Sequence, residues 1–371
     1  MRNQVLIVAG EVSGDIHAAN LVTDLKKLRP ELEISGVCGE RLREAGVHCL
    51  ASTEELAHMG LVEVVRELPR IRELMKRLVA YADRQRPDLA VLVDSPDFNL
   101  RLARRLKKIG VPVVLYVSPQ LWAWRKGRVR QVRRLAREVL CILPFETKFY
   151  EEHQVPARYV GHPLVDDFER EGLLEGVAAR HARRLALMPG SREMEVRSLL
   201  PAMLGALRKM PKTIVEDAVL IEAPGISATV DEVLENAEAD PRLRRIRGEG
   251  RRLALGSSAL ALTASGTATL ECALLDVPMI VGYRLKRFSW WLAKVLVNVP
   301  HVALVNLILQ DRAVPELLQD RWNPDALAAL AGELLANEGG DQPKALAEVR
   351  SRLGGPGASL KAAEAVVRHL P

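Results

Sequence analysis

The first half of the chain alternates short apolar runs with longer stretches whose apolar residues recur one helical turn apart, as Leu21, Leu25 and Leu28 do. The short runs predict buried strands, because they are too short for helices. The strands expected here are Val5–Val8, Ile34–Cys38, Leu89–Val93, Val113–Val117 and Val139–Leu143, and the helices are Asp15–Leu28, Leu68–Gln85 and Phe98–Ile109. This alternation predicts a parallel sheet with helices on both faces.

The pattern lapses around Pro163–Gly176, which is acidic and contains glycine, and then resumes. The second half predicts strands at Leu185–Met188, Ala218–Glu222, Ala259–Thr263 and Met279–Val281, helices at Ser198–Lys209, Ser227–Ala237 and Ala268–Leu275, and a mostly helical remainder. We therefore expect an α/β protein with two doubly wound, Rossmann-like domains facing across a cleft, at residues 1–166 and 167–345. Residues 346–371 form a helical tail that packs on the first domain or on a partner subunit.

Composition narrows the class of partner. The chain has 371 residues with a formal net charge of +6, which suits phosphate-bearing ligands or anionic lipid. Aromatic residues make up only 4% of the chain, which disfavours nucleic acid, because single-strand sites rely on aromatic stacking. The four cysteines are scattered and predict reduced thiols, and no apolar run reaches the roughly 20 residues of a spanning helix. We expect a cytoplasmic protein whose membrane contact is peripheral.

The first predicted strand runs into a small-residue turn, Ala9-Gly-Glu-Val-Ser-Gly-Asp15. Glycines there let the backbone approach a ligand, and the following helix presents free N–H groups. The turn makes Ser13 and Gly14 candidate ligand contacts, and His17 follows on the helix. The alternative is an ordinary capped turn with Ser13 or Asp15 as the cap.

Two carboxylates follow the buried strand Leu89–Val93. Asp94 comes where the strand meets the expected crevice, which is where open α/β sheets bind ligands, so it is the candidate base. Asp97 is expected to cap the helix that begins near Phe98.

Aromatic and basic residues gather after the strand Val113–Val117, in Trp122-Ala-Trp-Arg-Lys126. Trp124 and Arg125 together can hold an acyl chain and a phosphate. The alternative is a packed loop followed by a solvated basic helix.

Two turns in the second half have the character of phosphate sites. Pro189-Gly-Ser-Arg192 offers the donors of Gly190, Ser191 and the guanidinium of Arg192. Ala264-Ser-Gly-Thr-Ala-Thr-Leu-Glu271 opens a helix, so its N–H groups and the hydroxyls of Ser265 and Thr267, around Gly266, can cradle a second phosphate. Glu271 lies one turn into that helix, where a carboxylate can accept from ribose hydroxyls. Together the two turns predict a diphosphate nucleotide.

The segment Phe288–Val299 mixes aromatic residues with cations and is too short to span a bilayer. It predicts a helix in the membrane interface, with Phe288, Trp290 and Trp291 toward lipid. A buried helix or a dimer contact explains the pattern equally well.

With these residues in place, the chain resembles the lipid-A-disaccharide synthase family from about residue 5 to about residue 320. The motifs that carry the resemblance, in order, are Ala9–Asp15, Met59–Val64, Asp94–Asn99, Tyr116–Pro119, Trp122–Arg125, Leu143–Glu146, Gly161–Pro163, Pro189–Arg192, Ala264–Glu271 and Gly282–Arg284. The resemblance adds Met59 to the acceptor side and Tyr283 and Arg284 to the donor side. It also matches Asp94, Arg192 and Asn306 to residues that the family needs for activity. Val305 stands where the family usually has a proline.

The resemblance implies the type B glycosyltransferase fold, with UDP held mainly by the second domain. It implies a reaction of UDP-2,3-diacylglucosamine with 2,3-diacylglucosamine 1-phosphate, without metal or cofactor, at the inner face of the cytoplasmic membrane. We expect direct, inverting displacement with Asp94 as the base and His17 as its alternative. The competing readings are a UDP-sugar 2-epimerase and a non-catalytic nucleotide- or lipid-binding relative. Oligomeric state is left open, with a homodimer as one outcome.

Overall fold

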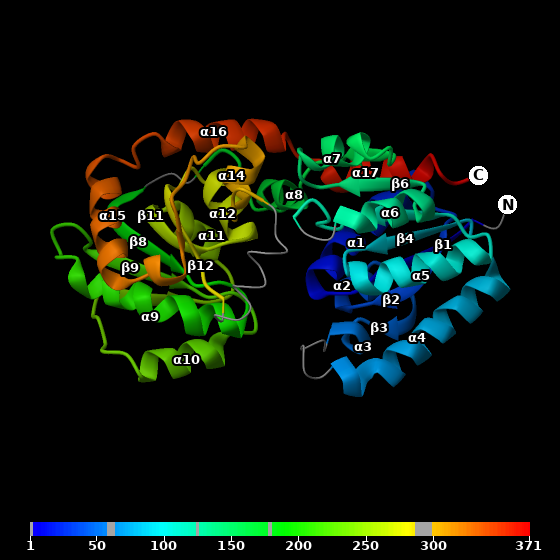
Figure 1. The fold of residues 1–371 in the computed structure, drawn as a ribbon, viewed down its shortest axis with the longest axis horizontal. Helices are drawn as coiled ribbons and strands as arrows, with labels where there is room; N and C mark the ends of the chain where they lie inside the picture. Colours follow the sequence, from blue (N-terminus) through cyan, green and yellow to red (C-terminus); the bar gives the residue numbers. More distant parts are fainter. Residues whose placement is uncertain (1–2, 58–63, 124–125, 177–179, 286–298) are drawn as a thin grey trace. The chain divides into compact units, whose positions relative to one another are not determined.

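The structure, a computed structural model, describes residues 3–57, 64–123, 126–176, 180–285 and 299–371 (Figure 1). The chain forms two compact units. Unit 1 comprises residues 1–166 and 355–371, and unit 2 comprises residues 167–354. The division at residue 346 expected from the sequence falls inside a helix, and the chain leaves unit 2 only at Gly354.

Unit 1 is built on a parallel sheet of seven strands in the order β3-β2-β1-β4-β5-β6-β7. The strands are β1 (Gln4–Ala9), β2 (Glu33–Cys38), β3 (His48–Ser52), β4 (Leu89–Val93), β5 (Val113–Tyr116), β6 (Glu138–Cys141) and β7 (Ala157–Tyr159). Every residue of β4 is buried, as expected for a strand covered on both faces. The strand order reverses direction between β1 and β4, and open α/β sheets bind ligands beyond the carboxyl ends of the strands at such a switch point.

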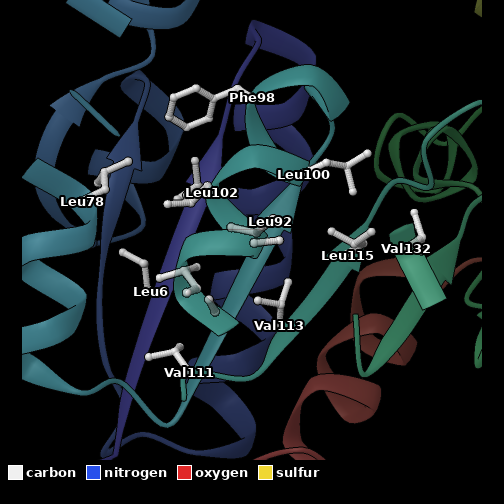
Figure 2. Packing of buried hydrophobic residues seen from close by; sticks show 14 of the residues in the cluster. Leu6, Leu78, Leu92, Phe98, Leu100, Leu102, Val111, Val113, Leu115 and Val132 are labelled. Atoms are coloured by element: carbon white, nitrogen blue, oxygen red, sulfur yellow. The ribbon is translucent and has the colours of Figure 1, made fainter. Parts of the chain in front are cut away.

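Helices cover both faces of this sheet: α1 (Val12–Leu28), α2 (Glu40–Glu44), α3 (Glu54–Ala57), α4 (Val64–Gln85), α5 (Pro96–Lys108), the 3-10 turn η1 (Lys126–Arg128), α6 (Val129–Leu135), α7 (Glu146–Glu152) and α17 (Ala358–Val367). The chain passes from unit 1 to unit 2 within α8 (Pro163–Arg170). Alternate residues of β1 serve the two faces: Leu6 packs toward α4 and α5, whereas Ile7 packs toward α1 and α17. Figure 2 shows Leu6 and Leu92 of the sheet beside Leu78 of α4 and Leu102 of α5.

The last helix, α17, belongs to unit 1 and packs on α1. The carboxylate of Asp166 accepts hydrogen bonds from the backbone N–H groups of Gly357, Ala358 and Ser359 at 2.6–3.0 Å. Because these are the otherwise unpaired donors at the start of α17, a negative charge there anchors the helix.

Unit 2 repeats the architecture with six parallel strands in the order β10-β9-β8-β11-β12-β13. They are β8 (His181–Met188), β9 (Asp217–Ile221), β10 (Leu243–Ile246), β11 (Ser258–Ala264), β12 (Met279–Tyr283) and β13 (Glu316–Leu318). The helices are α9 (Glu193–Lys209), α10 (Ser227–Glu235), α11 (Arg251–Gly256), α12 (Thr267–Leu274), α14 (Leu304–Leu309), the 3-10 turn η2 (Gln319–Arg321), α15 (Pro324–Ala336) and α16 (Gln342–Leu353). Here the strand order reverses between β8 and β11.

Every strand and helix listed from the periodicity is present: β4 has the expected bounds, and each of the others has at least one shifted end. Other elements were missed. The stretch expected to lapse, Pro163–Gly176, begins with α8. The C-terminal remainder is not purely helical, because β13 adds an edge strand. The short strands β3, β7 and β10 were missed as well. β7 shows why: its three residues are all half-buried, so no apolar run marks it.

Candidate active site

The turns after β1 and β4 meet at the switch point of unit 1. A Cβ atom at Gly10 would lie 2.2 Å from the Cβ of Ser95, so only glycine allows this approach. A Cβ atom at Gly14 would lie 3.6 Å from that of Asp94. The two motifs that the sequence singled out separately therefore form one site.

Asp94 occupies a strained backbone conformation. Asp94 and Ser95 have φ angles of 53° and 42°, in the left-handed region that non-glycine residues seldom adopt. The side chain of Asn99, itself 1% exposed, braces this turn: its Nδ2 donates to the carbonyl oxygens of Val93 (3.1 Å) and Asp94 (2.7 Å). The Asp94 side chain is thereby aimed from a fixed backbone.

His17 lies one helical turn beyond Gly14 on α1 and is half-buried. His162 is buried close enough for the two charges to interact. Burial, reinforced by His17, lowers the pKa of His162 to about 3, so His162 is neutral near pH 7. The Leu164 N–H donates to His162 Nδ1 at 3.1 Å, which places the ring proton of the neutral imidazole on Nε2.

Neither the alternative capping role of Ser13 or Asp15 nor the expected capping role of Asp97 is correct. Ser13 lies inside α1, whose N-cap is Glu11, and Asp15 accepts instead from the N–H groups of Gly39 (2.6 Å) and Arg41 (3.0 Å) at the start of α2. Asp97 lies within the first turn of α5, because the helix begins at Pro96, and its carboxylate pairs with Arg128 at 2.5 Å.

The loop after β5 lies beside this site, because Asp94 N–H donates to the carbonyl of Tyr116, the last residue of β5, at 3.1 Å. Ser118 and Trp122 on this loop are buried, and both donate to the carboxylate of Glu146. The sequence had assigned no role to Glu146.

In unit 2, the turn after β8 closes on a carboxylate. Arg192 is the N-cap of α9, and its side chain is 76% exposed. Glu195 Oε2 accepts from the N–H groups of Ser191 (3.0 Å) and Arg192 (3.3 Å), and Oε1 lies 3.1 Å from the Arg192 guanidinium. Gly190, with φ 113°, leaves room for that carboxylate. The N–H groups of this turn thus bind a carboxylate of the chain itself, in a capping box.

The turn after β11 lies on the neighbouring strand. Ser265 N–H donates to Gly282 on β12, and its hydroxyl donates to Val302 O at 2.6 Å. Gly266, with φ 139°, is the N-cap of α12, and Thr267 is exposed at the first helical position. Tyr283 ends β12; burial raises the pKa of its hydroxyl, and Glu195 raises it further. Arg284 follows and is exposed. The two turns therefore lie at the same edge of the sheet.

Asn306 is fully buried. Its Nδ2 donates to Val314 O (2.9 Å) and to Glu316 Oε1 (2.8 Å), and its Oδ1 accepts from Val314 N–H (2.9 Å). Glu316 also accepts from the N–H groups of Val302 and Ala303. Asn306 therefore fixes the segment that receives the Ser265 hydroxyl.

Glu271 is half-buried on α12, with its Oε1 3.4 Å from Arg252 Nε of α11. Burial raises the pKa of Glu271, and the Arg252 charge opposes that shift. Arg252 also pairs with Asp167 and Glu171 and lies over the ring of Phe168. The arginine that faces Glu271 is thus shared among several acids.

Six further candidates lie outside the described residues: Met59, Trp124, Arg125, Phe288, Trp290 and Trp291. Within the described residues, no group of three or more His, Cys, Asp or Glu side chains is arranged to hold a metal ion.

Four residues that hold the candidate site were missed: Asn99, Glu146, Glu195 and Glu316. Glu195 carried a signal, because it lies three residues after the helix N-cap, as in a capping box. Asn99 and Glu146 carried a weaker signal, because each ends a motif of the resemblance, but the motif does not say what either side chain holds. The partners of Glu316 lie 10 to 14 residues away, so nothing local marks it.

The whole chain matches known proteins. A family model for lipid-A-disaccharide synthetase matches residues 5–365. The lipid-A-disaccharide synthase of Anaeromyxobacter dehalogenans (strain 2CP-C) is 44% identical over 375 residues, covering 99% of this chain and 97% of that protein. The Myxococcus xanthus enzyme of the same name is 42% identical over 388 residues, covering 99% and 98%.

Solved structures share the fold at low identity. The UDP-GlcNAc 2-epimerase from Neisseria meningitidis aligns with a TM-score of 0.66 at 12% identity, covering 98% of this chain and 100% of that one. The glycotransferase of kitacinnamycin aligns with a TM-score of 0.64 at 15% identity, covering 99% of both chains. These neighbours show the two-domain type B glycosyltransferase fold. The near full-length relatives show more: this chain belongs to the lipid-A-disaccharide synthase family.

Proposed function

We propose that the enzyme condenses UDP-2,3-diacylglucosamine with 2,3-diacylglucosamine 1-phosphate, giving the β-1,6-linked disaccharide 1-phosphate and UDP. Residues 1–166 bind the acceptor and residues 167–345 bind the UDP-sugar. The observation that carries the proposal is Asp94, held by Asn99 in a strained turn at the switch point of a chain that matches this family over residues 5–365.

Asp94 takes the proton from the acceptor 6-hydroxyl while the oxygen of that hydroxyl attacks the anomeric carbon of the donor sugar and UDP leaves. A single displacement inverts that carbon, which fits an α-linked donor and a β product. His17 on α1 is the alternative base.

Arg192 and the turns at Gly190–Ser191 and Ser265–Thr267 stabilise the charge that develops on the leaving diphosphate. Glu195 now accepts from the N–H groups of this turn, so a diphosphate that binds them has to displace its carboxylate. Tyr283, Arg284 and Glu271 complete the donor side, and Asn306 contributes by positioning the segment around Val302.

The 2-epimerases share only the fold, at 12% identity in the meningococcal case. The relatives that match nearly the whole sequence are named as lipid-A-disaccharide synthases, which favours the transferase over the epimerase and over a non-catalytic relative.

The acyl chains of both substrates require attachment to a membrane surface. No helix in the described ranges is long and apolar enough to cross a bilayer. Exposed cations on α5 and α6, which pack against each other, supply a basic surface in unit 1: Arg101, Arg104, Arg105, Lys107, Lys108, Arg130, Arg133 and Arg134. Such a surface attracts anionic headgroups.

The test incubates the purified protein with both acylated substrates and follows the products by mass spectrometry. Disaccharide 1-phosphate and UDP should appear in equal amounts. Release of a 2-epimerised sugar, or no reaction in the presence of detergent or vesicles, would contradict the proposal.

A further inference from the structure

Unit 1 contains a buried carboxylate that the proposed chemistry does not use. Glu146, the first residue of α7, is 1% exposed. Its Oε1 accepts from Ser118 Oγ (2.6 Å) and Trp122 Nε1 (3.0 Å), and its Oε2 accepts from Leu143 N–H (3.1 Å). Among the described residues it forms no ion pair with a cation. A carboxylate buried without a counterion is costly, so its retention calls for a reason beyond packing.

The hydrogen bonds of Glu146 fix the loop that leaves β5. Trp122 also meets the ring of Phe145 edge-on, with 4.9 Å between centroids, and Tyr150 OH donates to Pro119 O at 2.9 Å. α7 and the residue before it therefore hold residues 118–122 at several points. The loop begins at Val117, whose φ of 60° is strained for a β-branched residue, so these contacts oppose relaxation of the backbone.

This loop leaves the sheet beside Asp94. β5 pairs with β4 in parallel register, and the Asp94 N–H bonds to the last residue of β5. The loop therefore leaves the same sheet edge, next to the proposed base.

We propose that Glu146 is a positioning residue: its ionised carboxylate orients the loop at residues 117–123, and use of the acceptor sugar depends on that orientation. The inference rests on the proposed function. Protonation removes the negative charge and turns one oxygen into a donor, so the neutral carboxyl group accepts these three hydrogen bonds more weakly and holds the loop less firmly.

Burial raises the pKa of Glu146 to about 7, and the hydrogen bond from Ser118 is the largest effect opposing that rise. The other titratable groups that interact with it are Cys141 of β6, Tyr150 of α7 and Tyr159 of β7. Burial raises the pKa of all three, so they stay neutral near pH 7 and Glu146 is the group of this cluster that changes charge there.

The experiment compares the pH dependence of kcat/KM for the acceptor between pH 5.5 and 9. In Ser118→Ala the acidic limb should move up by about one pH unit, because loss of a hydrogen bond to a charged group raises its pKa. In Glu146→Gln, kcat/KM at pH 8 should fall about tenfold through a higher acceptor KM, with UDP affinity unchanged, and the limb due to Glu146 should vanish.

Thr23→Ala is the matched control, because its hydroxyl donates to a backbone carbonyl of α1 at 2.9 Å and not to a carboxylate. The pH profile of Thr23→Ala should match that of the wild type. A limb caused by titration of the acceptor phosphate should be the same in every variant. An unshifted limb in Ser118→Ala overturns the inference, and so does a wild-type limb in Glu146→Gln. If Glu146→Gln fails to fold, Ser118→Ala still decides. A wild-type enzyme that makes no disaccharide instead contradicts the proposed function.

Discussion

At the scale of single residues, polar groups near the two switch points either face solvent or brace the backbone. Asp94 is half-buried and free to meet a substrate, whereas Asn99 and Asn306 use their amides within the protein. A general base contributes about 10²–10⁴-fold. Asp94→Asn should therefore lower turnover at least a hundredfold and leave UDP affinity unchanged, as measured by disaccharide formation and calorimetry.

Asp97→Asn is the control for that substitution, since it removes a neighbouring carboxylate whose partner is the surface residue Arg128. An exposed ion pair contributes about 0–1 kcal/mol to stability, so Asp97→Asn should leave the fold intact. Because Asp97 is not the proposed base, turnover should stay near the wild-type value. An Asp94→Asn enzyme with more than a tenth of wild-type turnover would point to His17 as the base.

Arg192 permits a similar comparison on one helix. Arg192→Ala should weaken UDP binding by about 1.5–3 kcal/mol, the range for a hydrogen bond to a charged group. Arg197 on the same α9 is half-exposed and pairs with Glu232, so Arg197→Ala should leave UDP affinity unchanged. Equal affinities for the two variants in isothermal titration would make Arg192 an ordinary surface cation.

His162 makes folding depend on pH. Its folded pKa of about 3 lies below the ordinary value of 6.5, so the unfolded chain binds more protons between those values. The stability it provides is complete above pH 6.5 and declines toward pH 3. His162→Gln should therefore lose less thermal stability than the wild type between pH 8 and pH 5, the difference being about 2 kcal/mol. If the stabilities of the wild type and of His162→Gln fall in parallel between pH 8 and pH 5, His162 is not a buried neutral imidazole.

At the scale of elements, the sequence predicted those whose burial is continuous. β4 is a run of five buried apolar residues, and its end at Val93 correctly placed Asp94 directly after the carboxyl end of the strand. Edge strands such as β13 were not predicted, because three residues with mixed exposure show no periodic pattern of apolar positions. The partners of Glu146 and Glu316 could not be predicted for another reason: the local pattern fixes where a turn lies but not which distant donor faces it.

Asn306 tests one such long-range brace. Asn306→Ala removes three hydrogen bonds that join α14 to Val314 and to Glu316 of β13. It leaves buried donors and acceptors unpaired, which costs about 1–3 kcal/mol for each such group. Global stability should fall by at least that amount, and UDP affinity should fall because the Val302 segment no longer holds Ser265. Asn323→Ala, which removes a helix cap far along the chain, should lower stability by about 1 kcal/mol without changing UDP affinity.

At the scale of the whole molecule, the charge distribution suits an enzyme that works on lipid. The cations of α5 and α6 have one acid among them, Asp97, whereas surface arginines of unit 2 such as Arg183 and Arg244 face carboxylates. Paired arginines already have their counterion, so the unit 1 surface should dominate attraction to anionic headgroups.

We therefore expect the protein to bind vesicles containing anionic lipid and to be released in part by salt, since each cation near the surface contributes about 1 kcal/mol. Replacing Arg104, Arg105, Arg130 and Arg134 with glutamine should weaken binding by more than tenfold in a sedimentation assay. A control variant with glutamine at Arg183, Arg197, Arg244 and Arg208 loses the same net charge from unit 2 and should bind almost as well as the wild type. Equal losses would mean that net charge alone governs attachment. The double variant Trp290→Glu with Trp291→Glu tests the other candidate for the membrane contact. If only this variant loses vesicle binding, the contact lies in the segment Phe288–Val299 and not on α5 and α6.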